Sequence, residues 1–137
     1  MNKAMEEWIA LYEKKTGEEF KRDERFVLFY LPEKGFAEIM DAGDMLVVNQ
    51  LCGEIKFWRA FIELLARELG RKTIGTFFIR PIKPYMRLLG FVPYEIKKTP
   101  LGDSFFCKDK RTGQKGDAAP IGKDTYCVTW EINTNEI

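Results

Sequence analysis

The hydrophobic pattern of the sequence changes its repeat at Gly53, and this change limits the folds that the chain can form. Before it, residues 45–51 (MLVVNQL) form a nearly continuous apolar run that indicates a strand. After it, apolar side chains recur at three- and four-residue spacing up to Gly70, which is typical of a helix. Residues 72–79 (KTIGTFFI) then indicate another strand. Strand, helix and strand in this order form a crossover, so the two strands should lie parallel.

The other segments predict short elements around this crossover. We expect helices over 2–16 and 81–89, the crossover helix over 54–69 with Phe57, Phe61 and Leu65 on the sheet, and strands over 25–31, 36–40, 91–96, 103–108 and 125–132. The first of these strands (RFVLFYL) should be buried on both faces, because its apolar residues are continuous. Residues 109–124 are polar and rich in glycine and charge, which predicts a mobile loop. The sequence therefore predicts one α/β domain over 1–137, with a mixed sheet of about six or seven strands.

The composition excludes several classes of function. The chain has 22 Lys and Arg residues against 21 Asp and Glu residues, a net charge of +1, which disfavours non-specific nucleic-acid binding. It has no histidine, which removes histidine-based triads, histidine-containing zinc sites and imidazole bases. No apolar run approaches the roughly 20 residues that span a bilayer. We expect a cytoplasmic protein without a bound metal.

The three cysteines, Cys52, Cys107 and Cys127, show no C-x-x-C spacing. An odd number without this spacing argues against a disulfide framework or a cysteine-only zinc site and fits a reducing compartment. No histidine is present to activate Cys52, so we expect a small buried side chain there and not a nucleophile.

Gln50, Gly53 and the tripeptide Leu89-Gly90-Phe91 stand at positions that can be compared with a known family. Gln50 and Gly53 match the first and fourth positions of a Q/R-x-x-G-x-G/A turn between a strand and a long helix. The tripeptide matches an "lGF" that ends a later short helix. On these residues and on the order of the elements, residues 25–98 resemble the GNAT-type N-acetyltransferases.

The resemblance implies a site for acetyl-CoA as cosubstrate. In this family the turn opens a helix whose N-terminus attracts the pyrophosphate, and the preceding strand diverges from its neighbour to accept the pantetheine arm. The residues that the resemblance places in this site are Val47, Val48, Gln50, Cys52, Gly53, Glu54, Ile55 and Lys56.

The sequence departs from the family pattern at three positions. Ile55 stands where the family has Gly or Ala, and Glu54 would place a negative charge beside a bound pyrophosphate. Met86 occupies the usual place of a tyrosine that protonates the leaving thiolate, while Tyr85 lies one residue earlier. A plain strand-to-helix turn is the alternative interpretation of Gly53.

Glu38 and Tyr85 are the candidate catalytic residues. The resemblance implies that a carboxylate or a water chain deprotonates the amine, and Glu38 lies on a strand that flanks the expected cleft. The alternative for Glu38 is a plain surface position, because strand alternation places it opposite to Ile39. Tyr85 is the candidate acid.

Two hypotheses of function follow. The first is an acyl-CoA-dependent N-acyltransferase with an unknown amine acceptor, which needs no covalent enzyme intermediate. The second is a catalytically inactive GNAT-fold binding or assembly module, for example one encoded by a phage or a mobile element. The sequence does not predict the oligomeric state.

Overall fold

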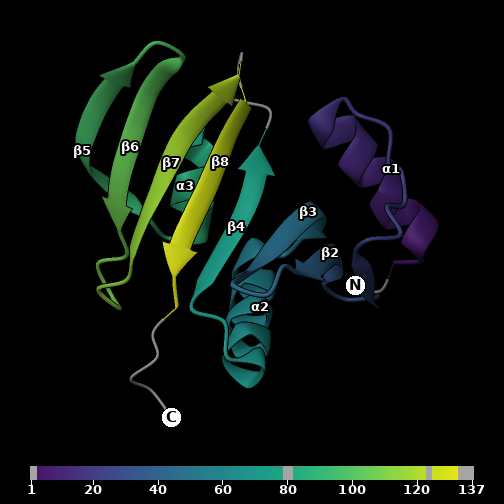
Figure 1. Ribbon diagram of the computed structural model, residues 1–137. Coiled ribbons are helices and arrows are strands. Elements are labelled where there is room, and N and C mark those ends of the chain that lie inside the picture. Colours follow the sequence, from purple (N-terminus) through teal and green to yellow (C-terminus); the bar gives the residue numbers. More distant parts are fainter. Residues whose placement is uncertain (1–2, 79–81, 123–124, 133–137) are drawn as a thin grey trace.

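The computed structural model describes residues 3–78, 82–122 and 125–132, and all described strands belong to one mixed sheet (Figure 1). The strand order is β1-β2-β3-β4-β8-β7-β6-β5. The elements are α1 (Met5–Thr16), β1 (Val27–Leu31), β2 (Gly35–Asp41), β3 (Met45–Gly53), α2 (Ile55–Leu69), β4 (Thr73–Phe78), α3 (Ile82–Leu89), β5 (Val92–Thr99), β6 (Gly102–Lys108), β7 (Lys115–Gly122) and β8 (Thr125–Glu131). The predicted α+β mixed-sheet fold class is confirmed. The predicted element ends at residues 79 and 81 lie outside the described residues.

The parallel crossover predicted from the change of repeat is present. β3 and β4 pair in parallel from Met45 with Thr73 to Val48 with Thr76, and α2 connects them. β1, β2 and β3 form an antiparallel meander, with β3 as the member of this pair. On the other side, β4 pairs antiparallel with β8.

The crossover helix α2 buries one face on the sheet. Its apolar core positions are Trp58, Ile62 and Ala66, which repeat every four residues and are almost inaccessible to solvent. The side chains that we expected on the sheet pack against this core from its margin and are partly buried: Phe57, Phe61 and Leu65. The predicted contact of α2 with the sheet is therefore present, but each of the most buried residues lies one position after the residue that we expected there.

The first helix, α1, lies on the opposite face of the meander. Trp8 and Tyr12 of α1 pack with Phe36 of β2 in a second apolar cluster. The next residue in β2, Ala37, belongs to the cluster under α2. Because neighbouring residues of a strand point to opposite faces, the two helices enclose β2 and β3 between them.

β1 is an edge strand, and the expectation that it is buried on both faces is wrong. Its end residues Val27 and Leu31 are exposed, and the three residues between them are half-buried. The continuous apolar run misled the prediction because β1 pairs with β2 alone among the described strands.

The predicted mobile loop over 109–124 is also wrong, because it contains strand β7. β7 pairs with β6 on one side and β8 on the other, which raises the number of strands to eight. Its core-facing residues are Ala118 and Pro120, both small and weakly hydrophobic. Gly116 is needed for close packing, since a Cβ there would lie 2.8 Å from the carbonyl oxygen of Thr129. A strand whose buried residues are small was missed because strands are predicted from runs of large apolar residues.

The sequence predicted neither a membrane-spanning segment nor a metal site, and both expectations can be compared with the described part of the chain. None of its helices is long and apolar enough to cross a membrane. Among the residues described, no three Cys, Asp or Glu side chains are grouped closely enough to hold a metal ion.

Candidate active site

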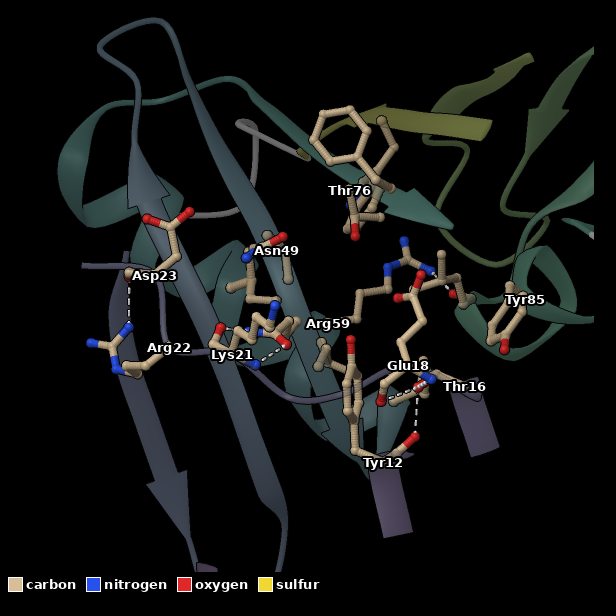
Figure 2. Close-up of a pocket in the computed structure, with 18 of the residues that line it drawn as sticks. Tyr12, Thr16, Glu18, Lys21, Arg22, Asp23, Asn49, Arg59, Thr76 and Tyr85 are labelled. Carbon is tan, nitrogen blue, oxygen red and sulfur yellow. Dashed lines mark hydrogen bonds between the residues drawn. The ribbon is translucent and has the colours of Figure 1, made fainter. Parts of the chain in front are cut away.

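A cavity of about 630 Å³ opens where β3 and β4 diverge. The pairing of these strands ends at Val48 with Thr76. Beyond this pair β3 continues to Gly53 alongside β2, while β4 continues to Phe78 alongside β8. The two strands therefore follow different neighbours, and the space between them is lined by both. Figure 2 shows Asn49 of β3 and Thr76 of β4 at this opening.

A β-bulge in β3 accompanies the divergence. Ala37 of β2 pairs with Leu51, but Ile39 pairs with Val48, so two residues of β3 face one residue of β2. The two bulged residues are Asn49 and Gln50, and the residue opposite them is Glu38. Bulges increase the local twist and bend a strand, which is what turns the end of β3 away from β4.

Glu38 is fully buried behind this bulge, so the alternative of a plain surface position is wrong. Its carboxylate accepts hydrogen bonds from the side-chain amides of Asn49 and Gln50 and from the backbone N–H of Asp23. It also forms an ion pair of 2.5 Å with Arg22. Strand alternation does place Glu38 opposite to Ile39, but the α1–β1 connection covers that face and excludes solvent from it.

The connection between α1 and β1 forms one wall of the cavity. The side chain of Gln50 holds it, accepting a hydrogen bond from the N–H of Lys21 and donating one of 2.6 Å to its carbonyl oxygen. The ring of Phe20 packs against those of Tyr12 and Phe36 on the far side. The wall is therefore fixed to both β3 and α1, and Tyr12 also faces the cavity (Figure 2).

A buried polar network forms the opposite margin of the cavity. Arg59 of α2 lines the cavity and forms ion pairs with Glu63 at 3.2 Å and with Asp109 at 2.8 Å. It also donates to the carbonyl oxygen of Leu89 at the end of α3 and to Gln114. Burial by itself raises the pKa of Asp109, but the N–H of Arg111 and the Arg59 guanidinium outweigh it and hold that pKa below its ordinary value.

The turn from β3 into α2 packs on the turn between β1 and β2. Gly53 has φ +121°, and a Cβ there would lie 1.9 Å from the carbonyl oxygen of Lys34. The same oxygen accepts hydrogen bonds from the N–H of Glu54 and from Nε1 of Trp58. Glycine at position 53 is therefore required by this close approach of two backbone segments.

The N-terminus of α2 carries no side-chain cap. The amides of its first turn, which belong to Ile55, Lys56 and Phe57, lie before the first hydrogen bond of the helical ladder, from Trp58 to Glu54. Glu54 forms an ion pair of 2.7 Å with Lys34, which partly offsets its negative charge beside these amides.

The structure brings some of the predicted site residues to the cavity and places others away from it. Those that line it are Val48, Gln50, Ile55 and Tyr85. Those outside its lining are Glu38, Val47, Cys52, Gly53, Glu54 and Lys56. Cys52 is buried on the α1 side of the sheet, as expected, and burial raises the pKa of its thiol.

Sequence reasoning missed several residues at the cavity, among them Asn49, Arg59 and Thr76. Arg59 and Glu63 interrupt the apolar face of α2 at a four-residue spacing, and this interruption was a readable signal of a buried pair. Thr76 gave no such signal, because its place beside β3 depends on the parallel pairing.

Comparisons with known proteins give one structural likeness. No protein-family model matches the chain, and no curated protein sequence matches it. The ribosomal-protein-S18-alanine N-acetyltransferase from Escherichia coli has a similar structure, with 15% sequence identity and a TM-score of 0.48 over 97% of this chain and 92% of that chain.

Proposed function

We propose that the chain is an acyl-CoA-dependent N-acyltransferase that works in the cavity between β3 and β4. The observation that carries this proposal is the divergence of two parallel neighbouring strands beyond Val48 and Thr76, with a cavity between them. A volume of about 630 Å³ lies within the range of small-molecule sites. The amine acceptor and the acyl group would meet there.

The backbone of β3 suits the amide-like arm of an acyl-CoA. Beyond Val48, β3 has left β4, and after the bulge it pairs on its other side with β2 from Leu51 to Gly53. Backbone groups on the side facing the cavity can therefore pair with the amides of a pantetheine arm, as they would with another strand.

The first turn of α2 suits the pyrophosphate. Its amides lie at the positive end of the helix dipole, and the side chain of the N-cap residue Glu54 does not cap them. Lys56 is exposed on this turn and adds a positive charge. The ion pair between Glu54 and Lys34 reduces the repulsion that an isolated carboxylate would cause.

Tyr85 is the residue that we propose to donate a proton. It lines the cavity from α3 (Figure 2). The amine nitrogen would attack the thioester carbonyl carbon near it. The carbon–sulfur bond then breaks, and the departing thiolate takes the proton of the Tyr85 hydroxyl. The proton that the attacking nitrogen loses passes through solvent to the Tyr85 oxygen and restores its hydroxyl. Glu38 would act through Asn49 and Gln50, keeping the bulge in the shape that opens the cavity. The prediction that Glu38 itself is the base stays a prediction.

A second candidate function is a binding module without catalysis. The observation that favours it is at Gly53, where packing on the turn at Lys34 accounts for the glycine without any phosphate. The N–H of Glu54 is also occupied by that packing. A cytoplasmic location and an origin in a phage or mobile element stay predictions.

Thermal unfolding with acetyl-CoA distinguishes the two candidates. A ligand at about 100 times its dissociation constant stabilises a protein by about 2.7 kcal/mol, which raises the Tm of a domain this size by several degrees. Acetyl-pantetheine, which lacks the nucleotide and pyrophosphate, should give a smaller shift at equal concentration. A flat titration with millimolar acetyl-CoA would contradict the acyltransferase and support the binding module.

Ile55→Pro tests the proposed pyrophosphate site. Proline is tolerated at the first helical position, and Glu54 has the extended conformation that a following proline requires (φ −78°, ψ 99°). The variant removes one amide donor, whereas the control Ile55→Ala keeps it. Weaker acetyl-CoA binding by calorimetry in the proline variant alone supports the site, and equal binding by both variants contradicts it.

Thiol release from acetyl-CoA in the presence of primary amines tests catalysis. Tyr85→Phe should lower kcat and leave the affinity for acetyl-CoA unchanged, because only the proton donor is lost. If kcat is unchanged in this variant, Tyr85 is not the acid.

A further inference from the structure

β5 is the outermost strand of the sheet, and its outer edge is not paired with any described residue (Figure 1). All eight of its residues are exposed. Val92, Tyr94 and Ile96 expose 44%, 58% and 54% of their surface. The strand at the other end, β1, has five residues, and the chain just before α1 is bonded beside its end, from the N–H of Lys3 to the carbonyl oxygen of Pro32. β5 is therefore the longer and less protected edge.

The direction of the free hydrogen-bonding groups follows from the hairpin between β5 and β6. Thr99 pairs with Gly102 across a two-residue turn, so the backbones of these two residues exchange hydrogen bonds. The pair of Lys97 and Ser104 lies two residues further from the turn on each strand and exchanges hydrogen bonds in the same way. The backbone groups of Ile96 and Lys98 then point away from β6. They present a row of donors and acceptors to a further strand.

Charged residues along β5 are arranged so that the strand complements itself. Glu95 and Lys97 lie on one face and are themselves 3.8 Å apart. In an antiparallel pair of two β5 strands centred on Ile96, Glu95 of each copy faces Lys97 of the other. Two pairs of opposite charge then lie on one face, with Ile96 against Ile96 on the other, and both kinds of pair stabilise a sheet.

Neighbouring registers lack this complementarity. A pair centred on Glu95 places two carboxylates opposite each other, and a pair centred on Lys97 places two ammonium groups opposite each other. Like charges in directly opposed positions destabilise a strand pair. The sequence of β5 therefore selects the register centred on Ile96.

We propose that two copies of this chain associate through their β5 edges, antiparallel and centred on Ile96, to form one continuous sheet. The proposal does not depend on acyl transfer, since β5 contributes no residue to the cavity between β3 and β4. One strand pair buries less area than a standard stable interface, so the association should depend on concentration in the micromolar range or above.

Charge variants test the register. Glu95→Lys and Lys97→Glu should each weaken the dimer by roughly tenfold or more in sedimentation experiments, because each places like charges in both cross-strand pairs. An equimolar mixture of these two variants should associate again as a heterodimer, because its pairs are again of opposite charge. The double variant Glu95→Lys/Lys97→Glu should form a homodimer like the wild type. Lys14→Glu is the control and should not change association, because Lys14 is exposed on α1, which packs on β2 and β3 near the other end of the strand order.

Ile96→Pro tests the edge itself. It removes an N–H that points away from β6, and proline is tolerated in edge strands, so the far-UV circular dichroism should stay that of the wild type. The variant should be monomeric at concentrations where the wild type is dimeric. A wild-type protein that stays monomeric up to millimolar concentration overturns the proposal. A dimer that survives Ile96→Pro, or a mixture of charge variants that does not associate, also overturns it.

Discussion

Nε2 of Gln50 donates a hydrogen bond of 2.5 Å to Oε1 of Glu38 in the interior of the protein. The same side-chain amide is bonded to the backbone of Lys21 through both its oxygen and its nitrogen. One side chain thus connects β2, the bulge of β3 and the wall of the cavity. The residue that matches the first position of the family's turn therefore has a structural task of its own.

Glu38→Ala should lower the free energy of unfolding by about 1–3 kcal/mol, because Asn49 and Gln50 lose the acceptor for their buried amides. Glu38→Gln keeps the shape and one acceptor oxygen, so its loss should be smaller. Urea denaturation measures both. Glu24→Ala, at an exposed site of the same wall, is the control. If Glu38→Ala is as stable as this control, the hydrogen bonds at Glu38 do not hold the bulge.

Gly53→Ala should destabilise the protein by about 3–5 kcal/mol, because backbone strain at positive φ adds to a collision with the carbonyl oxygen of Lys34. Gly17→Ala is the matched control, since Gly17 has φ +68° and nothing lies within 4 Å of a Cβ there. The control should lose only about 1–2 kcal/mol. Thermal unfolding of the two variants gives the comparison. Equal losses would show that packing at Lys34 is not the reason for the glycine.

Asp109 should make stability depend on acid pH. Its folded-state pKa lies below the ordinary value, so its ionised form stabilises the protein above the unfolded pKa of about 4, and this contribution disappears as pH falls through the folded pKa. The stability difference between the wild type and Asp109→Asn should therefore be largest at neutral pH and shrink below about pH 4. Denaturation at several pH values measures it, with exposed Asp103→Asn as control. A difference that is constant with pH would contradict the ion pair with Arg59.

The three thiols should react slowly in the folded protein. Burial raises the pKa of Cys107 to about 11 and also raises that of Cys52 and Cys127, so little thiolate is present at pH 8. A colourimetric disulfide reagent should modify half-buried Cys127 first and all three rapidly in urea. Cys52→Ser should keep any acyltransferase activity. Rapid modification of Cys52 in the native protein would refute the burial argument.

The crossover could be predicted because its signal is local. The helical repeat of α2 and the apolar run of β3 are both readable within a few residues, and a parallel pair follows from their order. β7 could not be predicted in the same way, because Ala118 and Pro120 fill the core with little hydrophobic signal. Their burial depends on strands β6 and β8, which lie on either side of β7 only after folding.

The candidate site could be predicted only in part, because some of its residues follow from local sequence signals and others depend on contacts between distant segments. Val48, Gln50 and Ile55 were candidates because they lie in or next to a recognisable turn, and all three line the cavity. Glu38 was given a surface position as its alternative because alternation places it opposite to Ile39, and the connection that covers this face contacts it only in three dimensions. Arg59 joins elements far apart in the chain, so its partners Asp109 and Gln114 are visible only in three dimensions.

The position of the parallel pair in the sheet has a consequence for the order of folding. On one side of it, β1 to β3 are consecutive in the chain, and on the other, β5 to β8 are also consecutive. Each group can form hairpin by hairpin with short loop closures, which is kinetically favourable. The contacts of β4 with β3 and β8, such as Thr73 with Glu131, join distant parts of the chain and should form last. β4, which lines one side of the cavity, would then be the last strand to join the sheet.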